Sequence, residues 1–136
     1  MKKIVFYISV CSLILFCGCY DDSPIESKPG ESIDPVTNLQ ANIREGEEED
    51  IVLNWDLPSD YPEDVIEPVS VHIQVKIDGR REGGDIVLDS APETYTYSPY
   101  DESMNYSFTV KVLAIVETSE PHESDLRYSL GETVEL

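Results

Sequence analysis

The stretch Val69-Ser70-Val71-His72-Ile73-Gln74-Val75-Lys76-Ile77 decides the fold class of this chain. Its β-branched residues stand at every second position with polar residues between them, which predicts a strand with one buried and one solvated face. Asp78-Gly79 follows at once and predicts a tight turn. A strand with one wet face favours an antiparallel sheet, because parallel sheets are covered on both faces.

Short segments of similar pattern lie on both sides of this stretch. We predict further strands over residues 36–41, 51–56, 86–88, 94–97, 106–112 and 128–136, and a loop over 58–68, which holds three prolines and four acids. Seven short strands in about 100 residues, separated by turn residues, predict an all-β, seven-stranded antiparallel sandwich.

Three of these segments resemble the fibronectin type III domain. Asp34–Ala41 is similar to its first strand, Ile51–Pro58 to its second strand with the core tryptophan at Trp55, and Tyr106–Val112 to its sixth strand. The resemblance implies an immunoglobulin-like sandwich over residues 33–136, although Tyr100 stands where that family has a core leucine. Other immunoglobulin-like folds stay open. At the start of this strand, Tyr106 can bury its ring while its hydroxyl forms a hydrogen bond with the backbone of residues that precede it.

The N-terminus has the pattern of an export signal. Lys2 and Lys3 precede an uncharged segment over residues 4–16, which is shorter than the ~20 residues that span a bilayer. The following Phe16-Cys17-Gly18-Cys19 resembles the lipobox of bacterial lipoproteins. This resemblance implies a signal peptide over residues 1–18 and lipidation of Cys19; the alternative is an ordinary secretory signal.

The residues after Cys19 predict where the chain is displayed. Tyr20-Asp21-Asp22 resembles the acidic signal that places lipoproteins of Bacteroides-type bacteria on the cell outer membrane, facing the exterior. Residues 19–32 are acidic and nearly free of apolar side chains, so we predict a disordered tether, with the sandwich following over residues 33–136. The membrane is then a partner through the lipid on Cys19.

Charge and cysteine content exclude several classes of function. The formal net charge is −19, and removal of residues 1–18 leaves 7 Lys and Arg against 28 Asp and Glu, a charge of −21. Such an acidic chain is not expected to bind nucleic acid, which requires a basic surface. The three cysteines are Cys11, Cys17 and Cys19, so residues 33–136 contain no disulfide, thiolate metal site or cysteine nucleophile.

No motif in the chain predicts catalysis. His72 stands on the polar side of its strand and His122 lies in a loop, so both are expected to be solvated. Nucleophile-elbow, phosphate-loop and zinc-protease motifs are absent. We therefore predict no enzyme, no catalytic residue, no cofactor and no metal site. Two acidic clusters contain carboxylates of the kind that bind calcium but lack the spacing of a calcium-binding loop, so we interpret them as solvated surface: Glu47, Glu48, Glu49 and Asp50; and Asp56, Asp60, Glu63 and Asp64.

Tyrosines provide the remaining functional hypothesis. Tyr95, Tyr97, Tyr100 and Tyr106 lie within twelve residues, and Tyr61 lies in the proline-rich loop. We expect Tyr95, Tyr97 and Tyr106 in the core with Trp55, and Tyr61 at the surface.

The predicted function is a surface lipoprotein whose non-catalytic sandwich serves protein interaction or structural spacing in an envelope assembly. The alternative is a glycan-binding accessory of an outer-membrane polysaccharide uptake system, with exposed tyrosines stacking on sugar rings.

Overall fold

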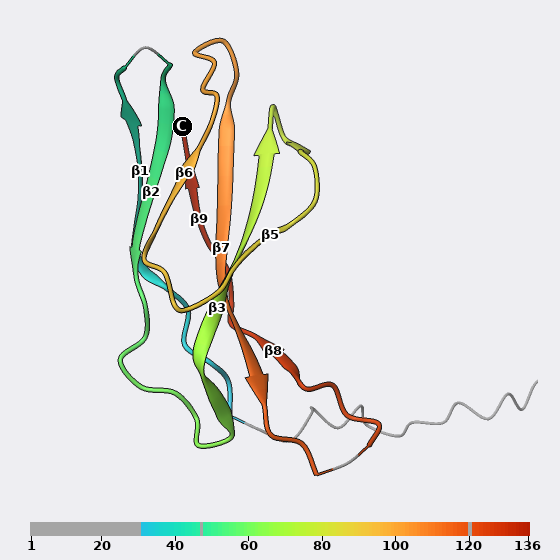
Figure 1. The fold of residues 1–136 in the computed structure, drawn as a ribbon. Coiled ribbons are helices and arrows are strands. Elements are labelled where there is room, and N and C mark those ends of the chain that lie inside the picture. Colours follow the sequence, from blue (N-terminus) through green and yellow to red (C-terminus); the bar gives the residue numbers. More distant parts are fainter. Residues whose placement is uncertain (1–30, 47, 120) are drawn as a thin grey trace, which may run out of the picture.

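Strands are the only regular elements in the part of the chain that the structure describes (Figure 1). This computed structural model describes residues 31–46, 48–119 and 121–136, so the predicted signal peptide, Cys19 and most of the predicted tether lie outside it. The all-β prediction is confirmed. The strands are β1 (Thr37–Arg44), β2 (Asp50–Asp56), β3 (Val65–Ile77), β4 (Arg80–Arg81), β5 (Ile86–Leu88), β6 (Thr94–Tyr97), β7 (Tyr106–Val116), β8 (Leu126–Tyr128) and β9 (Glu132–Glu135).

Two antiparallel sheets form the sandwich, which confirms the predicted architecture. The smaller sheet has the order β1-β2-β6, and the larger has the order β4-β3-β7-β8, with β5 also pairing β3 and β9 also pairing β7. Figure 1 shows the two layers side by side, with β3 and β7 as the long central strands of the larger one. The alternating pattern of β3 and β7 thus provides ten of the fifteen buried apolar side chains among the described residues.

The core lies between the sheets and includes the predicted inward residues of segments 51–55, 69–75 and 106–112. Trp55 is only 3% exposed, as predicted, and its Nε1 donates a hydrogen bond to the Pro92 carbonyl at 2.9 Å. The other buried apolar side chains come from both sheets and from the segment before β1: Ile33, Val36, Ile51, Leu53, Val69, Val71, Ile73, Val75, Tyr106, Phe108, Val110, Val112, Ala114 and Val116.

Several strand boundaries differ from the prediction: β1 ends at Arg44 and β7 at Val116, beyond the predicted ends at 41 and 112. β3 begins at Val65, inside the predicted loop 58–68, because Val65 and Ile66 pair with the end of β7. Pro68 falls where the β3–β7 register shifts, between Ile66 and Ser70. A proline has no backbone N–H to donate, so it fits a strand only at such an irregularity. The predicted turn at Asp78-Gly79 is confirmed, since both residues have positive φ and connect β3 to β4.

The predicted last strand, 128–136, is broken into β8 and β9. At the break, the Ser129 amide donates to the Val112 carbonyl at 2.9 Å, and the Ser129 hydroxyl accepts from the Val112 amide at 2.8 Å. The buried side chain of Ser129 therefore replaces one rung of the backbone ladder. Residue 131 is a glycine, and the fold requires this, because a Cβ at that position would lie only 2.6 Å from the Thr109 Cγ2 atom. This break, together with β4, accounts for nine strands where seven were predicted.

The chain enters and ends at opposite poles of the sandwich. Residues 31–36 lie at the pole that carries the β2–β3 and β7–β8 loops, at the lower end of Figure 1. At the other pole, Tyr106 and Leu136 exchange two backbone hydrogen bonds of 3.0 and 2.9 Å, which fix the C-terminus. Within the described residues there is no helix able to cross a membrane.

Candidate functional site

The two histidines occupy different environments. His122 is exposed, as predicted, but the expectation of a solvated His72 is wrong, because only 12% of its side chain is accessible. Its Nε2 lies 2.9 Å from Asp85 Oδ2, and its ring meets Tyr128 edge-on with centroids 5.5 Å apart. Hydrogen bonding from His72, reinforced by Arg81, lowers the pKa of the Asp85 carboxyl. His72 is therefore part of a packed polar group on β3 and not a solvated side chain.

The acidic clusters are dispersed in the fold. Glu48 and Glu49 are exposed, whereas Asp50 accepts hydrogen bonds from Ser98 and Arg44. Both bonds lower the pKa of the Asp50 carboxyl, and the bond from Ser98 has the larger effect. In the second cluster, Asp56, Asp60 and Glu63 are exposed, and Asp64 binds an arginine. Glu47 lies outside the described residues. Over residues 31–46, 48–119 and 121–136, no three His, Cys, Asp or Glu side chains are grouped so that they could hold a metal ion.

The predicted core tyrosines face inward. Tyr106 is 3% exposed, and its hydroxyl accepts a hydrogen bond from the Asp101 amide at 3.0 Å, which confirms the expected bond to upstream backbone. Tyr95 and Tyr97 are half-buried against the core, because they pair with the inward residues of β2. Tyr100, which replaces the core leucine, packs on the Tyr106 ring at 5.6 Å.

Tyr61 is not the exposed ring that we predicted. It is half-buried and packs against the core, and this burial raises the pKa of its hydroxyl, with smaller contributions from Glu67 and Glu93. The chain therefore offers no platform of tyrosine rings at the described positions that we considered for sugar binding: Tyr61, Tyr95, Tyr97, Tyr100 and Tyr106.

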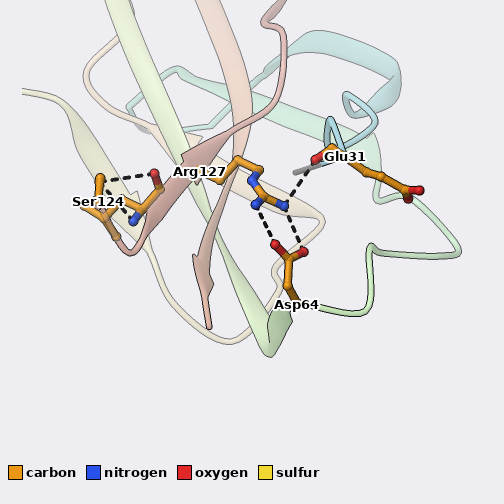
Figure 2. Close-up of polar contacts among 5 residues, drawn as sticks. Glu31, Asp64, Ser124 and Arg127 are labelled. Atoms are coloured by element: carbon orange, nitrogen blue, oxygen red, sulfur yellow. Dashed lines mark hydrogen bonds and ion pairs between the residues drawn. The ribbon is translucent and has the colours of Figure 1, made fainter. Parts of the chain in front are cut away.

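Arg127 joins three separate segments at the pole where the chain enters (Figure 2). Its guanidinium binds the Asp64 carboxylate with two parallel hydrogen bonds, of 2.9 Å to Oδ1 and 2.6 Å to Oδ2. Its Nη1 also donates to the Glu31 carbonyl at 3.1 Å. The bond from Arg127 lowers the pKa of Asp64, and the same pair raises the pKa of Arg127. We call these three residues the Arg127 clamp.

A shallow hollow of about 250 Å³ lies beside the Arg127 clamp. Its walls include the clamp itself, the apolar side chains of Val116 and Leu126, and the carboxylates of Glu117 and Glu123. Sequence reasoning did not single out Arg127. The available signal was its isolation, since it is the only Lys or Arg after Lys111 in a segment that contains six acids.

Comparison with known proteins identifies a solved structure with a similar fold and a family to which the chain belongs. One similar solved structure, described as "Myokine structure", has a TM-score of 0.50 and 17% sequence identity, and the match covers 78% of this chain and 96% of that chain. At this identity the likeness concerns the fold alone. A search of the curated proteins found no match.

The family comparison covers all of the described residues. A family model described as "Domain of unknown function (DUF4945)" matches residues 19–136, from the predicted lipidation residue to the last residue of the chain. On this match, the chain belongs to the DUF4945 family.

Proposed function

We propose that this protein is a lipid-anchored module of the cell outer membrane, in which a non-catalytic sandwich serves protein interaction or structural spacing in an envelope assembly. The Arg127 clamp carries this proposal. It fixes Glu31, the first described residue, against the β2–β3 and β7–β8 loops at one pole. A domain joined to its anchor in this way presents its opposite pole and both sheets away from the attachment point.

The extent of the family match supports an anchor at Cys19. The match begins at residue 19, which is the residue that would become the first of the mature chain. The segment before it has the basic start, apolar stretch and small residue before cysteine that a lipoprotein signal requires. Two acyl chains on Cys19 would hold the module stably, at about 0.8 kcal/mol for each buried CH₂.

The packing of the polar side chains supports a non-catalytic role. His72 is engaged by Asp85 and Tyr128, and the only guanidinium at the hollow is engaged by Asp64. The glycan alternative was motivated by a cluster of exposed tyrosines, and the inward packing of Tyr95, Tyr97 and Tyr106 removes that motivation.

Cell fractionation of the full chain tests the anchor. Cys19→Ala is expected to move the protein from the membrane fraction to the soluble fraction, whereas Cys17→Ala should leave it membrane-bound. Protease added to intact cells should digest the wild-type protein if it faces the exterior. Retention of Cys19→Ala in membranes at the wild-type level would refute the proposal.

A further inference from the structure

The outward face of the larger sheet is electrically balanced, although the chain carries 28 acids against 9 bases. Strand register and side-chain contacts place cations and carboxylates on it in equal number: Arg81, Lys76 and Lys111; and Asp85, Asp89 and Glu135. Net charge of one sign keeps copies of a protein apart. Two copies of so acidic a chain can pack only through a surface whose charges balance, and this face meets that condition.

An apolar strip crosses the same face near the pole of the Arg127 clamp. Ile66, Ile115 and Leu126 stand in register on β3, β7 and β8, and they are 46%, 52% and 45% exposed. In the next row, Leu113 stands beside Tyr128, which is 48% exposed. Scattered exposed hydrophobic residues are ordinary, but a contiguous patch across three strands marks an interaction surface.

The order of the strands decides how a second copy would meet this face. From one edge to the other, the order is β4 and β5, then β3, then β7, then β8 and β9. A two-fold axis parallel to the strands, placed between β3 and β7, reverses this order in the second copy. Each β3 then faces β7 of the other copy row by row, and each β4–β5 edge faces the β8–β9 edge.

This reversal brings opposite charges together at the pole of the C-terminus. Arg81 on β4 and Glu135 on β9 stand in one row at opposite edges of the sheet, with Lys76 and Ser107 between them. Each Arg81 would therefore face Glu135 of the other copy. Among the described residues, neither Lys76 nor Glu135 has an ion-pair partner in its own chain. The two-fold axis would complete both of these charges twice.

A second charged row matches in the same way. Lys111 on β7 pairs in register with His72, so the axis would place each Lys111 opposite His72 of the other copy. The Nε2 atom of that histidine lies 2.9 Å from the Asp85 carboxylate, which a lysine side chain from the other copy could also reach. Complementary charges of this kind set the register of an interface.

The apolar rows also match when they are reversed. Ile66 would face Ile115 of the other copy, so the two strips would cover each other. In the next row, Asp89 accepts a 2.9 Å hydrogen bond from Ser70, at the edge opposite Tyr128. Each Asp89 carboxylate would therefore lie opposite a Tyr128 hydroxyl, which can donate a hydrogen bond to it.

The size of the face suits a pair of molecules that share one membrane. Nine residues of β7, from Ser107 to Ile115, and four strands across give a face of about 30 by 19 Å. Two such faces bury roughly 1,100 Å², near the ~1,000 Å² that a specific interface requires. Such a pair is weak in dilute solution, but anchoring both copies in one membrane raises their effective concentration.

We infer that two copies of this chain pair through the outward faces of their larger sheets, about a two-fold axis parallel to the strands. This axis leaves both entry poles on the same side, as two lipid anchors in one membrane require. The orientation and the effective concentration rest on the proposed anchor at Cys19, whereas the match between the two faces does not.

Other occupants fit the face less well. A partner whose contact surface carries one sign of charge would meet as many like charges as opposite ones. An anionic membrane would be opposed by the carboxylates of Asp85, Asp89 and Glu135. A glycan would find a single exposed ring on this face, Tyr128, among aliphatic side chains.

Cysteine cross-linking of the full chain in its native membrane tests the pairing. Residues 33–136 contain no cysteine, so Ser107→Cys adds one thiol beside the expected axis. With a short bis-maleimide, we expect an adduct of two differently tagged copies. The unsubstituted chain should give none, and neither should Asn54→Cys, at an exposed position on the outward face of the smaller sheet.

A charge-swap experiment then identifies the facing residues. In the Ser107→Cys chain, Arg81→Glu or Glu135→Arg alone places like charges opposite each other and should lower the yield several-fold. When the two variants are co-expressed, each arginine faces a glutamate again, so the adduct between the two different chains should return. Arg44→Glu, which breaks an ion pair of the smaller sheet, is the matched control and should leave the yield unchanged.

The inference is overturned if position 107 gives no adduct of two copies, if position 54 gives an equal one, or if the adduct contains a different protein. Charge reversals without effect, or co-expression without recovery, would overturn it as well. Thermal unfolding of each variant verifies that the sandwich is intact. Fractionation of Cys19→Ala tests the anchor separately: loss of the adduct with an intact anchor refutes the pairing, and an adduct without an anchor refutes only the proposed attachment.

Discussion

The outward faces of the two sheets differ although they enclose one core. The smaller sheet presents polar rows, with Gln40, Asn54 and Thr94 in register and an Arg44–Asp50 ion pair beside them. The larger sheet presents an apolar strip, formed by the exposed side chains of Ile66, Ile115 and Leu126 in register on β3, β7 and β8. Folding requires only that the inward face be apolar, because outward positions gain little from burial. The difference between the outward faces therefore points to a function of the larger sheet.

A change in the shared core should destabilise both sheets together, and it gives the largest expected effect on the free energy of unfolding. Phe108 is fully buried on β7 and packs on Tyr97 and Tyr106. Phe108→Ala is expected to lower the free energy of unfolding by about 3–5 kcal/mol, through lost burial and the resulting cavity. Urea unfolding measures this change. Val87→Ala, at a half-exposed position, is the control and should change it by less than about 0.5 kcal/mol.

A change at the break in the last strand should affect the larger sheet alone. Gly131→Ala places a Cβ 2.6 Å from Thr109 Cγ2 and 3.1 Å from Lys111 Cε, and the expected cost is about 1–3 kcal/mol. Hydrogen exchange should accelerate for the amides of β8 and β9 more than for those of β1 and β2. Gly84→Ala is the matched control, because nothing lies within 4 Å of its Cβ position. Equal acceleration in both sheets would contradict this account.

The Arg127 clamp should make one pole of the sandwich sensitive to acid. The pKa of Asp64 is lower in the folded chain than in the unfolded chain, where it is about 3.9, so the carboxylate stabilises the fold above about pH 4. This stabilisation is lost as the pH falls through the folded-state pKa. Asp64→Asn should therefore lower Tm at pH 7, and its difference from wild type should shrink on acidification. Glu63→Gln is the control, and a difference independent of pH would contradict the prediction.

The smallest effect on stability is expected on the apolar strip itself. Ile115→Thr keeps a β-branched side chain on β7 and removes exposed apolar surface, so the free energy of unfolding should change by less than about 0.5 kcal/mol. Binding of a hydrophobic dye to the native chain should nevertheless fall. The matched change Asn54→Thr on the smaller sheet should leave both quantities unaltered. A large loss of stability from Ile115→Thr would mean that the strip serves folding rather than binding.

The sequence was sufficient to predict those parts of the fold that depend on the burial of apolar side chains alone. The alternation in Val69–Ile77 identified β3, and Trp55 and Tyr106 were placed in the core because large rings need burial. The start of β3 was missed because its only partners, Val116 and Ile115, are some 50 residues away in the chain. The break after β8 was missed because a buried serine hydroxyl can replace a backbone rung only in a known register.

The candidate surfaces were less predictable than the fold. Arg127, Asp64 and Glu31 are distant in the chain, so no local pattern places them together. The apolar strip likewise draws on β3, β7 and β8, and each strand alone contributes one or two ordinary exposed side chains. His72 was misjudged because alternation gives the face of a residue but not the neighbours, Asp85 and Tyr128, that cover it there.

The break between β8 and β9 also affects how molecules of this protein avoid one another. An unbroken edge strand exposes a row of free backbone groups, to which a strand of another chain can pair. Here the last strand is divided into segments of three and four residues, with Ser129 bonded inward to Val112. Such short segments give a neighbouring strand little to extend. Crowded copies at a surface can thus expose apolar side chains on a sheet face while this edge of the larger sheet resists pairing with a strand of another copy.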